Sequence, residues 1–148
     1  MVMEMNMTTV VSAAIIDTKE RKVLLAKRCA ETLFPLHWCT PGGVVEDGES
    51  RMGALFREIH EELKVRPIGG AMFRLLYKHE REVGEEKNKV TVFCYLIPAD
   101  YIADIEHAQC GDKTVEIKWF GPDELDALLL TPADDANRET LKQLLLSL

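Results

Sequence analysis

Short runs of apolar residues, separated by polar turns, occupy most of the chain and predict β-strands. Val, Ile and Thr dominate the first run, and later runs alternate apolar with charged residues, as strands with one buried face do. The polar segments Asp17–Arg21 and Val83–Asn88 are expected to form turns. The predicted strands are Thr8–Ile16, Lys22–Arg28, Met72–Arg81, Lys89–Ile97 and Thr114–Phe120, with short extended pieces in Trp38–Val45 around the turn Pro41-Gly42-Gly43.

The spacing of apolar residues changes to a helical period in Ser50–Leu63. The apolar residues of this segment follow an i, i+3, i+4, i+7, i+11 pattern, which places them on one face of a helix. They are Met52, Leu55, Phe56, Ile59 and Leu63. Pro122–Leu130 and Asp134–Leu146 are also predicted to be helices, the first because it opens with proline and two acids. Because strands dominate and helices interrupt them, the predicted fold class is α+β (mixed α/β).

Length and composition indicate an ordinary globular protein. The chain has 148 residues, of which 47% are hydrophobic and 29% charged, as expected for a single domain over residues 1–148. No apolar stretch is long enough to cross a bilayer, and Met1–Met7 lacks the charged and apolar regions of a signal peptide. We therefore expect a cytoplasmic protein with no membrane partner.

The net charge of −7 disfavours a nucleic-acid polymer as the partner, because nothing would drive the release of counterions. A small phosphorylated substrate remains compatible with this charge, since a bound divalent cation reverses it locally. The four cysteines include no C-x-x-C pair, so we expect reduced thiols rather than a disulfide framework or a zinc site.

Three carboxylates crowd one side of the predicted helix Ser50–Leu63. Glu58 and Glu62 are four residues apart, and Glu61 completes an arc about 100° wide. Like charges at this spacing destabilise a helix by a few tenths of a kcal/mol, and a divalent cation would turn that penalty into a binding site. The alternative is a solvated acidic face. The glycines of Pro41-Gly42-Gly43, just upstream, favour a site because they let the backbone approach a ligand closely.

These residues resemble the signature of the Nudix hydrolases, G-x5-E-x7-R-E-U-x-E-E-x-G-U, in which U is aliphatic. The single departure is the late glycine, which is Lys64 here, where a left-handed conformation would cost a lysine about 1 kcal/mol. We expect either this penalty or a different helix end. Trp38-Cys39-Thr40-Pro41-Gly42-Gly43 also resembles the segment that precedes the family signature. The matching residues are Gly43, Glu49, Arg57, Glu58, Ile59, Glu61, Glu62 and Val65.

The resemblance implies a Nudix fold, an α/β/α sandwich with a mixed central sheet, and a Mg²⁺ cofactor that Mn²⁺ can replace. It implies that Glu58, Glu61 and Glu62, together with the Gly43 carbonyl, hold the metal. It also implies that Glu58, Glu61 and Arg57 are catalytic residues. The role of Arg57 is to orient Glu49 and the loop. In some family members the general base is an acid of the signature, and in others it is an acid on a later strand or loop.

Glu116 is the candidate for a later general base, and its alternative is an outward-facing strand residue. Four further residues are candidates for substrate binding, each with a structural alternative: Arg28 for phosphates, Trp38 for stacking on a base, Asn137 for reading a base edge, and Glu46 for metal or substrate. Asp134 could also read a base, although we expect it to cap the last predicted helix.

The short chain looks like the MutT-type nucleoside triphosphate pyrophosphohydrolases. This implies hydrolysis of a diphosphate linkage in a nucleoside or deoxynucleoside triphosphate, oxidised and non-standard bases included, with release of NMP and pyrophosphate. The alternatives are a nucleotide-sugar or other nucleoside-diphosphate-X hydrolase, and a Nudix-like sensor that binds a nucleotide without turnover. The expected partner is a small-molecule nucleotide, and the expected assembly is a monomer or homodimer.

Overall fold

The computed structural model describes residues 7–68, 73–111 and 113–148. Residues 1–6 and Met72, the predicted start of one strand, lie outside the described residues. The strands are β1 (Met7–Asp17), β2 (Lys22–Arg28), β3 (Trp38–Cys39), β4 (Gly42–Val44), β5 (Arg66–Pro67), β6 (Arg74–Val83), β7 (Asn88–Pro98), β8 (Ile102–Ala103) and β9 (Thr114–Phe120). The α-helices are α1 (Arg51–Leu63), α2 (Pro132–Ala136) and α3 (Arg138–Leu146), and the 3₁₀ helices are η1 (Ala99–Tyr101), η2 (Ile105–His107) and η3 (Glu124–Ala127).

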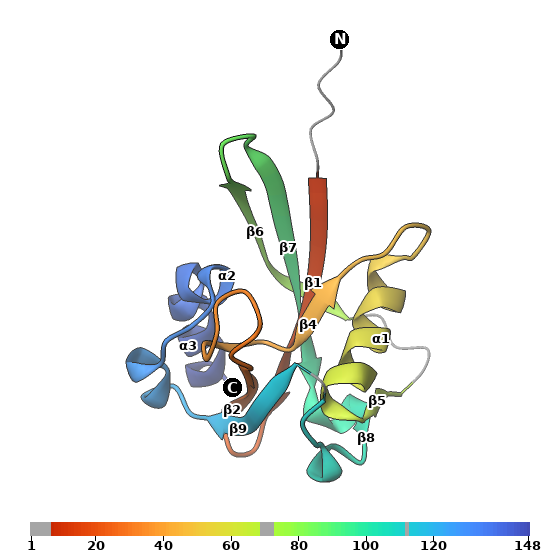
Figure 1. The fold of residues 1–148 in the computed structure, drawn as a ribbon. Coiled ribbons are helices and arrows are strands. Elements are labelled where there is room, and N and C mark those ends of the chain that lie inside the picture. The colour runs from red at the N-terminus through yellow and green to blue at the C-terminus, as the bar shows by residue number, and fades with distance from the viewer. Residues whose placement is uncertain (1–6, 69–72, 112) are drawn as a thin grey trace.

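A mixed sheet forms the centre of the molecule (Figure 1). Its main path runs β3-β2-β1-β7-β6, with β4 also paired to β1 and β9 paired to β2. The β1–β7 pair is parallel and the other pairs are antiparallel. Along one side, β1 pairs first with β4, through Val10, Val11 and Ser12, and later with β2, through Ile15, Ile16 and Asp17. This arrangement places the glycine strand β4 beside the buried part of β1.

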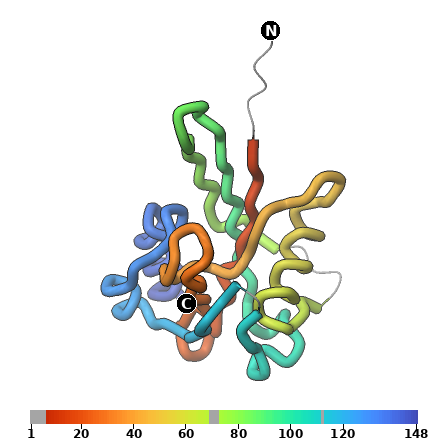
Figure 2. The backbone as a smooth tube through the Cα atoms, viewed as in Figure 1, coloured from red at the N-terminus to blue at the C-terminus, as the bar shows by residue number. Residues whose placement is uncertain are grey.

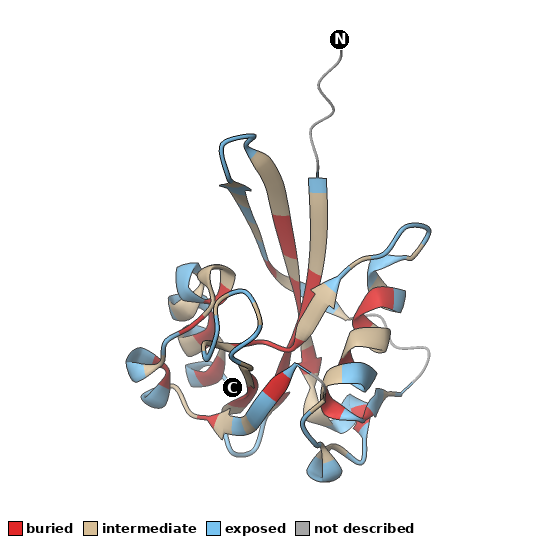
Figure 3. Cartoon of the chain, in the orientation of Figure 1, coloured by how far each residue is buried: buried red, intermediate tan, exposed pale blue. Residues whose placement is uncertain are grey.

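Alternating side chains of β1 divide the core into two layers. Val11, Ala13 and Ile15 pack toward α1, while Ala14 and Ile16 pack toward α3. Buried segments accordingly follow the central strands and the inner faces of the helices on both sides (Figure 3). Helix α1 covers one face of the sheet, and α2 and α3 cover the other (Figure 1). The predicted α+β fold with a mixed sheet between helices is confirmed.

Helix α1 begins and ends almost where the sequence predicts. Ser50 is the N-cap, and its hydroxyl accepts a hydrogen bond from the Gly53 amide at 3.0 Å. Lys64 ends the helix with φ 59° and ψ 25°, the left-handed conformation, and its amide donates to the His60 carbonyl at 3.0 Å. The backbone therefore adopts the geometry that suits glycine, although a lysine occupies the position.

The helix predicted over Pro122–Leu130 is wrong. Only the 3₁₀ turn η3 forms there, with Leu125 fully buried. After this turn the chain is extended, because the Trp38 amide donates to the Leu129 carbonyl at 2.8 Å and Leu130 forms a parallel bridge with Trp38. Because these long-range contacts hold Leu129 and Leu130 in an extended conformation, no helix forms there.

The single helix predicted over Asp134–Leu146 is also wrong. The helical region starts earlier, with Pro132 in the first turn of α2, and is interrupted at Asn137, which has φ −113° and ψ 18°. The Asn137 side chain donates to the Ala133 carbonyl at 2.8 Å and so supports this break. Within the residues that the structure describes, no helix has the length and apolar character needed to cross a membrane.

Candidate active site

The glycine strand β4 packs directly against the acid-bearing face of α1. Gly43 pairs with Val11 of β1, and the Glu58 carboxyl group lies against it. A Cβ atom at position 43 would come within 2.4 Å of that carboxyl group, which is closer than any real contact. A side chain at position 43 would therefore displace the Glu58 carboxylate from the strand backbone, which glycine allows it to approach.

Arg57 joins the loop after β4 to α1. Its Nε donates to Glu49 Oε2 at 2.8 Å and its Nη2 to Glu49 Oε1 at 2.9 Å, so the pairing predicted from the sequence is present. Nη2 also donates to the Val44 carbonyl at 3.0 Å. Nη1 donates to Glu58 at 2.8 Å and to Glu61 at 3.3 Å. One guanidinium thus holds the loop and two of the proposed metal ligands.

The acids of this cluster differ in their electrostatic environment. Hydrogen bonds from Arg57 lower the pKa of Glu49 to about 2. Burial raises the pKa of Glu62 to about 7, and the neighbouring Glu58 charge adds to this effect. Burial also raises the pKa of Glu58, although its hydrogen bond with Arg57 opposes the shift. A nearby cation would therefore stabilise the ionised forms of Glu58 and Glu62 most, because burial disfavours their charge.

The residues present fit a hard divalent cation, after a rearrangement of side chains. In the part of the chain that the structure describes, no three His, Cys, Asp or Glu side chains form a ready metal cage. Glu58 and Glu61 instead turn toward Arg57. Nevertheless, carboxylate oxygens and the adjoining Gly43 backbone are the donors that Mg²⁺ prefers, and Glu62 lacks full hydration. A change of rotamer at Glu58 and Glu61 would complete the set.

The charges of two basic residues act on these acids. Arg28 and Lys113 each lower the pKa of Glu62 through their charge, and Lys113 also lowers that of Glu58. Arg28 Nε donates to the Leu33 carbonyl at 2.7 Å, which fixes its side chain next to the loop after β2. Arg28 was predicted from the sequence, but Lys113 was not. A single lysine in a polar loop gives no periodic or motif signal.

Glu116 and Trp38 are not joined to the acid cluster. Ile117 and Trp119 of β9 pack on the α1 side of the sheet, so the alternation of the strand directs Glu116 to the opposite face. Glu116 is exposed and pairs with Lys27 across the ladder. The Trp38 ring meets Phe120 edge-on, with centroids 4.9 Å apart, and packs on the α3 side of the core.

The remaining candidates for substrate binding lie at two places. Glu46 is exposed on the loop before α1, and its carboxylate is 3.8 Å from Arg57 Nη1, within the acid cluster. Asn137 lies between α2 and α3, in the opposite layer. Its side chain is bound to the Ala133 carbonyl, and none of its described hydrogen bonds reaches α1.

Asp134 does not cap the final helix, so that expectation is wrong. It is 2% exposed and accepts hydrogen bonds from the Thr40 amide at 2.7 Å and the Tyr77 hydroxyl at 2.5 Å. The Thr40 hydroxyl also donates to both of its oxygens at 3.0 Å. This buried network ties α2 to the segment that leads into Pro41-Gly42-Gly43. The sequence did not show it because its members are far apart along the chain.

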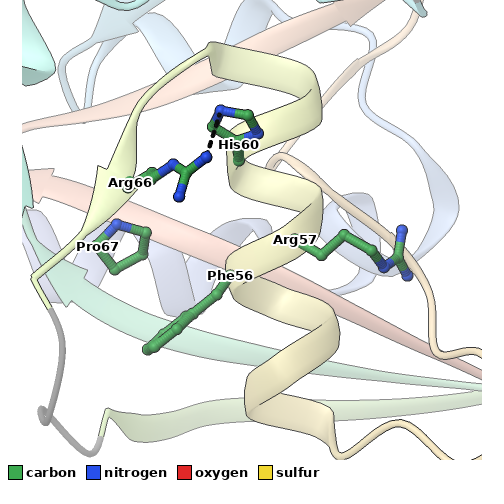
Figure 4. A pocket seen from close by; sticks show the side chains of 5 residues that line it. All are labelled: Phe56, Arg57, His60, Arg66 and Pro67. Atoms are coloured by element: carbon green, nitrogen blue, oxygen red, sulfur yellow. Dashed lines mark hydrogen bonds between the residues drawn. The ribbon is translucent and has the colours of Figure 1, made fainter.

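Two surface hollows are lined by residues other than Glu58, Glu61 and Glu62. One, of about 370 Å³, is lined by Phe56, Arg57, His60, Arg66 and Pro67 (Figure 4). The Arg57 side chain, which binds the acids, extends away from Arg66 and Pro67 (Figure 4). The other, of about 420 Å³, lies between α2 and the loop after β2, drawn in orange in Figure 2. Its lining includes Phe34, His37, His79, Leu130, Pro132 and Asp135.

A glycine strand held against an acid-bearing helix, within a mixed sheet between helices, is the arrangement that the signature resemblance implies. The family profile described as "NUDIX domain" matches residues 7–144, and this chain belongs to the Nudix hydrolase family. Members of this family generally use divalent metal ions.

Individual relatives agree with this assignment. The CTP pyrophosphohydrolase of Escherichia coli strain K12 is 32% identical over 130 residues, covering 88% of this chain and 87% of that protein. The solution structure of the E. coli ORF135 protein has a TM-score of 0.76 at 30% identity, covering 95% of this chain and 91% of the other. The MutT NUDIX hydrolase of Burkholderia pseudomallei has a TM-score of 0.75 at 25% identity, covering 93% and 98%. The chain is therefore MutT-like, with pyrophosphohydrolases among its relatives.

Proposed function

We propose that this protein hydrolyses a diphosphate linkage in a nucleoside or deoxynucleoside triphosphate, with Mg²⁺ as its cofactor, and releases NMP and pyrophosphate. The observation that carries the proposal is the packing of Glu58 against Gly43, with the poorly hydrated Glu62 beside it. Like charges held together in a partly desolvated place are stabilised by a cation, and hard oxygen donors select Mg²⁺.

In this proposal, Glu58, Glu61, Glu62 and the Gly43 carbonyl hold the ion. When bound, Mg²⁺ neutralises phosphate charge and makes a water molecule easier to deprotonate. Arg57 keeps the loop in place through Glu49. The attacking water loses its proton to a carboxylate, its oxygen bonds to phosphorus, and the anhydride P–O bond breaks with its electron pair on the leaving phosphate.

We assign the general base to the acids of the signature rather than to Glu116. Glu116 faces the opposite side of the sheet from α1, whereas Glu58 is in the cluster. Burial raises the pKa of Glu58, which makes its carboxylate a stronger base. Glu61 is the second candidate because it shares the Arg57 contact.

For the substrate, Arg28 is proposed to contact the phosphates and Glu46 the metal or substrate at the edge of the cluster. The hollow of about 420 Å³ beside α2 has room for a nucleobase. Asn137 follows Ala136 of its lining, and Trp38 precedes the glycine segment. CTP, the substrate named for the E. coli relative, is the first nucleotide to test.

The test is a screen of the purified protein against ribonucleoside and deoxyribonucleoside triphosphates, oxidised forms, and nucleotide sugars, with Mg²⁺ or with a chelator. We expect a triphosphate to give NMP and pyrophosphate with Mg²⁺ and nothing with the chelator. Reaction in ¹⁸O-labelled water then shows which phosphorus is attacked, because the label enters either NMP or pyrophosphate. Cleavage of nucleotide sugars alone would favour the alternative hydrolase, and binding without turnover would favour a sensor.

A further inference from the structure

Asp134 is a buried carboxylate of α2, and the next residue, Asp135, lines the surface hollow of about 420 Å³. Three donors surround the Asp134 carboxylate. The Thr40 amide donates at 2.7 Å, the Thr40 hydroxyl at 3.0 Å and the Tyr77 hydroxyl at 2.5 Å. Thr40 is 5% exposed and Tyr77 is 7% exposed, so water does not compete for these hydrogen bonds.

Each donor belongs to a segment that forms a wall of this hollow. Tyr77 precedes His79 by two residues in β6, so both side chains lie on the same face of the sheet, and His79 lines the hollow. Thr40 follows β3 and is three residues after His37, which also lines the hollow. Helix α2 is the third wall. The Asp134 carboxylate therefore binds one donor segment on each side and holds both against α2.

The bond from Tyr77 to Asp134 has a particular place among these contacts. The backbone joins β3 to the approach to α2, because the Trp38 amide donates to the Leu129 carbonyl at 2.8 Å and the Thr131 amide donates to the Trp38 carbonyl at 3.0 Å. Among residues 7–68, 73–111 and 113–148, the hydrogen bond that joins β6 to α2 is the one from Tyr77 to Asp134. This bond therefore sets how β6 and α2 lie relative to each other.

Stability alone does not account for a carboxylate at this position. The ion pairs in the described part of the chain include none that supplies a cation to Asp134. Well-packed apolar residues usually stabilise a buried position as well as charged groups do, or better. Hydrogen bonds, however, fix both distance and direction, whereas apolar contacts do not. The network is thus better suited to orienting three segments than to stabilising the fold.

We propose that Asp134 is a positioning residue that fixes the walls of this hollow and thereby determines which nucleobase the protein prefers. The inference rests on the function proposed above, in which the hollow takes the nucleobase. The described lining does not include Asp134, so it acts through the segments that carry His37, His79 and Asp135. Discrimination between bases depends on polar groups held to within a fraction of an ångström. Loosening the walls should therefore weaken base recognition and leave the acids of α1, in the opposite layer, unchanged.

The experiment compares the wild type with Tyr77→Phe, Asp134→Asn and the double variant. Tyr95→Phe is the matched control, because Tyr95 is a buried tyrosine of β7, 6% exposed, that packs in the α1 layer. Calorimetry measures the affinities for AMP, CMP, GMP and UMP, and separately for Mn²⁺ alone. For Tyr77→Phe we expect about fivefold or more weaker binding of the preferred monophosphate and a smaller preference among the four bases. Mn²⁺ affinity should stay within about twofold, and Tyr95→Phe should match the wild type.

The double variant shows whether the two residues act together. Because the Tyr77 hydroxyl acts through Asp134, the double variant should bind the preferred monophosphate no more weakly than Asp134→Asn alone. For a triphosphate that the wild type hydrolyses, Tyr77→Phe should raise KM about fivefold with little change in kcat. A changed base preference in Asp134→Asn with no effect of Tyr77→Phe would overturn the positioning role, since Asp134 would then contact the base itself. Equal losses in Tyr77→Phe and Tyr95→Phe would also overturn it.

Failure of this inference can be told apart from failure of the proposed function. A wild type that hydrolyses triphosphates with no preference among bases would overturn the role of Asp134 and leave the hydrolase assignment intact. A wild type that binds one monophosphate selectively but turns over no triphosphate would overturn the proposed function, and the same variants would still decide on Asp134.

Discussion

Arg57 donates two parallel hydrogen bonds to Glu49, from Nε to Oε2 at 2.8 Å and from Nη2 to Oε1 at 2.9 Å. This geometry uses the planar fork of the guanidinium, which an ammonium group cannot reproduce. The remaining nitrogen, Nη1, binds Glu58 at 2.8 Å. The residue that braces the loop therefore also binds a proposed metal ligand, and the proposed metal binding would require Nη1 to release or share that carboxylate.

Replacing Arg57 should lower both stability and turnover. Arg57→Ala removes the guanidinium that donates to Glu49 and Glu58, and Arg57→Lys loses the paired bonds, so we expect melting temperatures several degrees lower and turnover reduced about 10–100-fold. Arg66→Ala, which removes the same charge from the hollow beside α1, should change neither. Thermal unfolding and initial rates provide the measurements. An unchanged melting temperature together with a collapse of metal affinity would show that Arg57 is not a brace.

Lys64→Gly should stabilise the protein. Lys64 adopts φ 59°, which costs a non-glycine residue about 1 kcal/mol relative to the right-handed region, and part of this gain is offset by the greater freedom of glycine in the unfolded chain. We expect an increase of up to ~1 kcal/mol in the free energy of unfolding and no change in turnover. Lys87→Gly in the β6–β7 turn, also at positive φ, is a second site for the same test. Denaturant titration gives the values, and destabilisation at both positions would contradict the strain argument.

The parts of the molecule that the sequence predicted are those that local spacing determines. The period of α1 and the spacing of Glu49, Arg57 and Glu58 are properties of one short segment, so the helix and the brace were predictable. The 3₁₀ turn at Leu125 was not, because the bond between Trp38 and Leu129 joins distant segments and overrides helical propensity.

Two further features of the site also depend on contacts between distant segments, so local spacing did not predict them. Asp134 and Thr40 are 94 residues apart, so no local pattern reveals that the Asp134 carboxylate is buried against Thr40 and Tyr77 rather than used as a cap. The loop before β9 lies against the end of α1 only because Gly111 fits against the backbone of Glu61 and Glu62. Such contacts depend on the order of strands in the sheet, which periodicity does not specify.

Without metal, stability should fall as the pH rises from about 4.5 to about 7. The pKa of Glu62 is raised from 4.5 to about 7, so within this window the folded protein holds a proton that the unfolded chain has released. The contribution is fully present below the lower value and is lost as the pH passes the upper one. It amounts to on the order of 3 kcal/mol.

Denaturant midpoints measured with a chelator at several pH values test this dependence. Glu62→Gln should flatten the curve over the window, while Glu82→Gln, which changes an exposed strand residue, should leave it parallel to the wild type. Added Mg²⁺ should also remove the fall, because the metal favours the ionised carboxylate. Parallel curves for the wild type and Glu62→Gln would assign the pH dependence to another group.

Metal ligand and general base can be separated by comparing Glu62→Gln with Glu116→Gln. Glu62 is poorly hydrated and adjoins Glu58, so its replacement should weaken Mg²⁺ binding and lower the rate together, without destabilising the metal-free protein. Loss of a general base would instead lower the rate by roughly 10²–10⁴-fold at nearly normal metal affinity. Because Glu116 faces away from α1, we expect Glu116→Gln to keep wild-type turnover at saturating metal. Metal titrations followed by saturated rates decide between these outcomes: a Glu116→Gln variant with normal metal affinity and a rate reduced by that factor would transfer the base to β9, whereas full activity keeps it among the acids of α1, with Glu58 tested next.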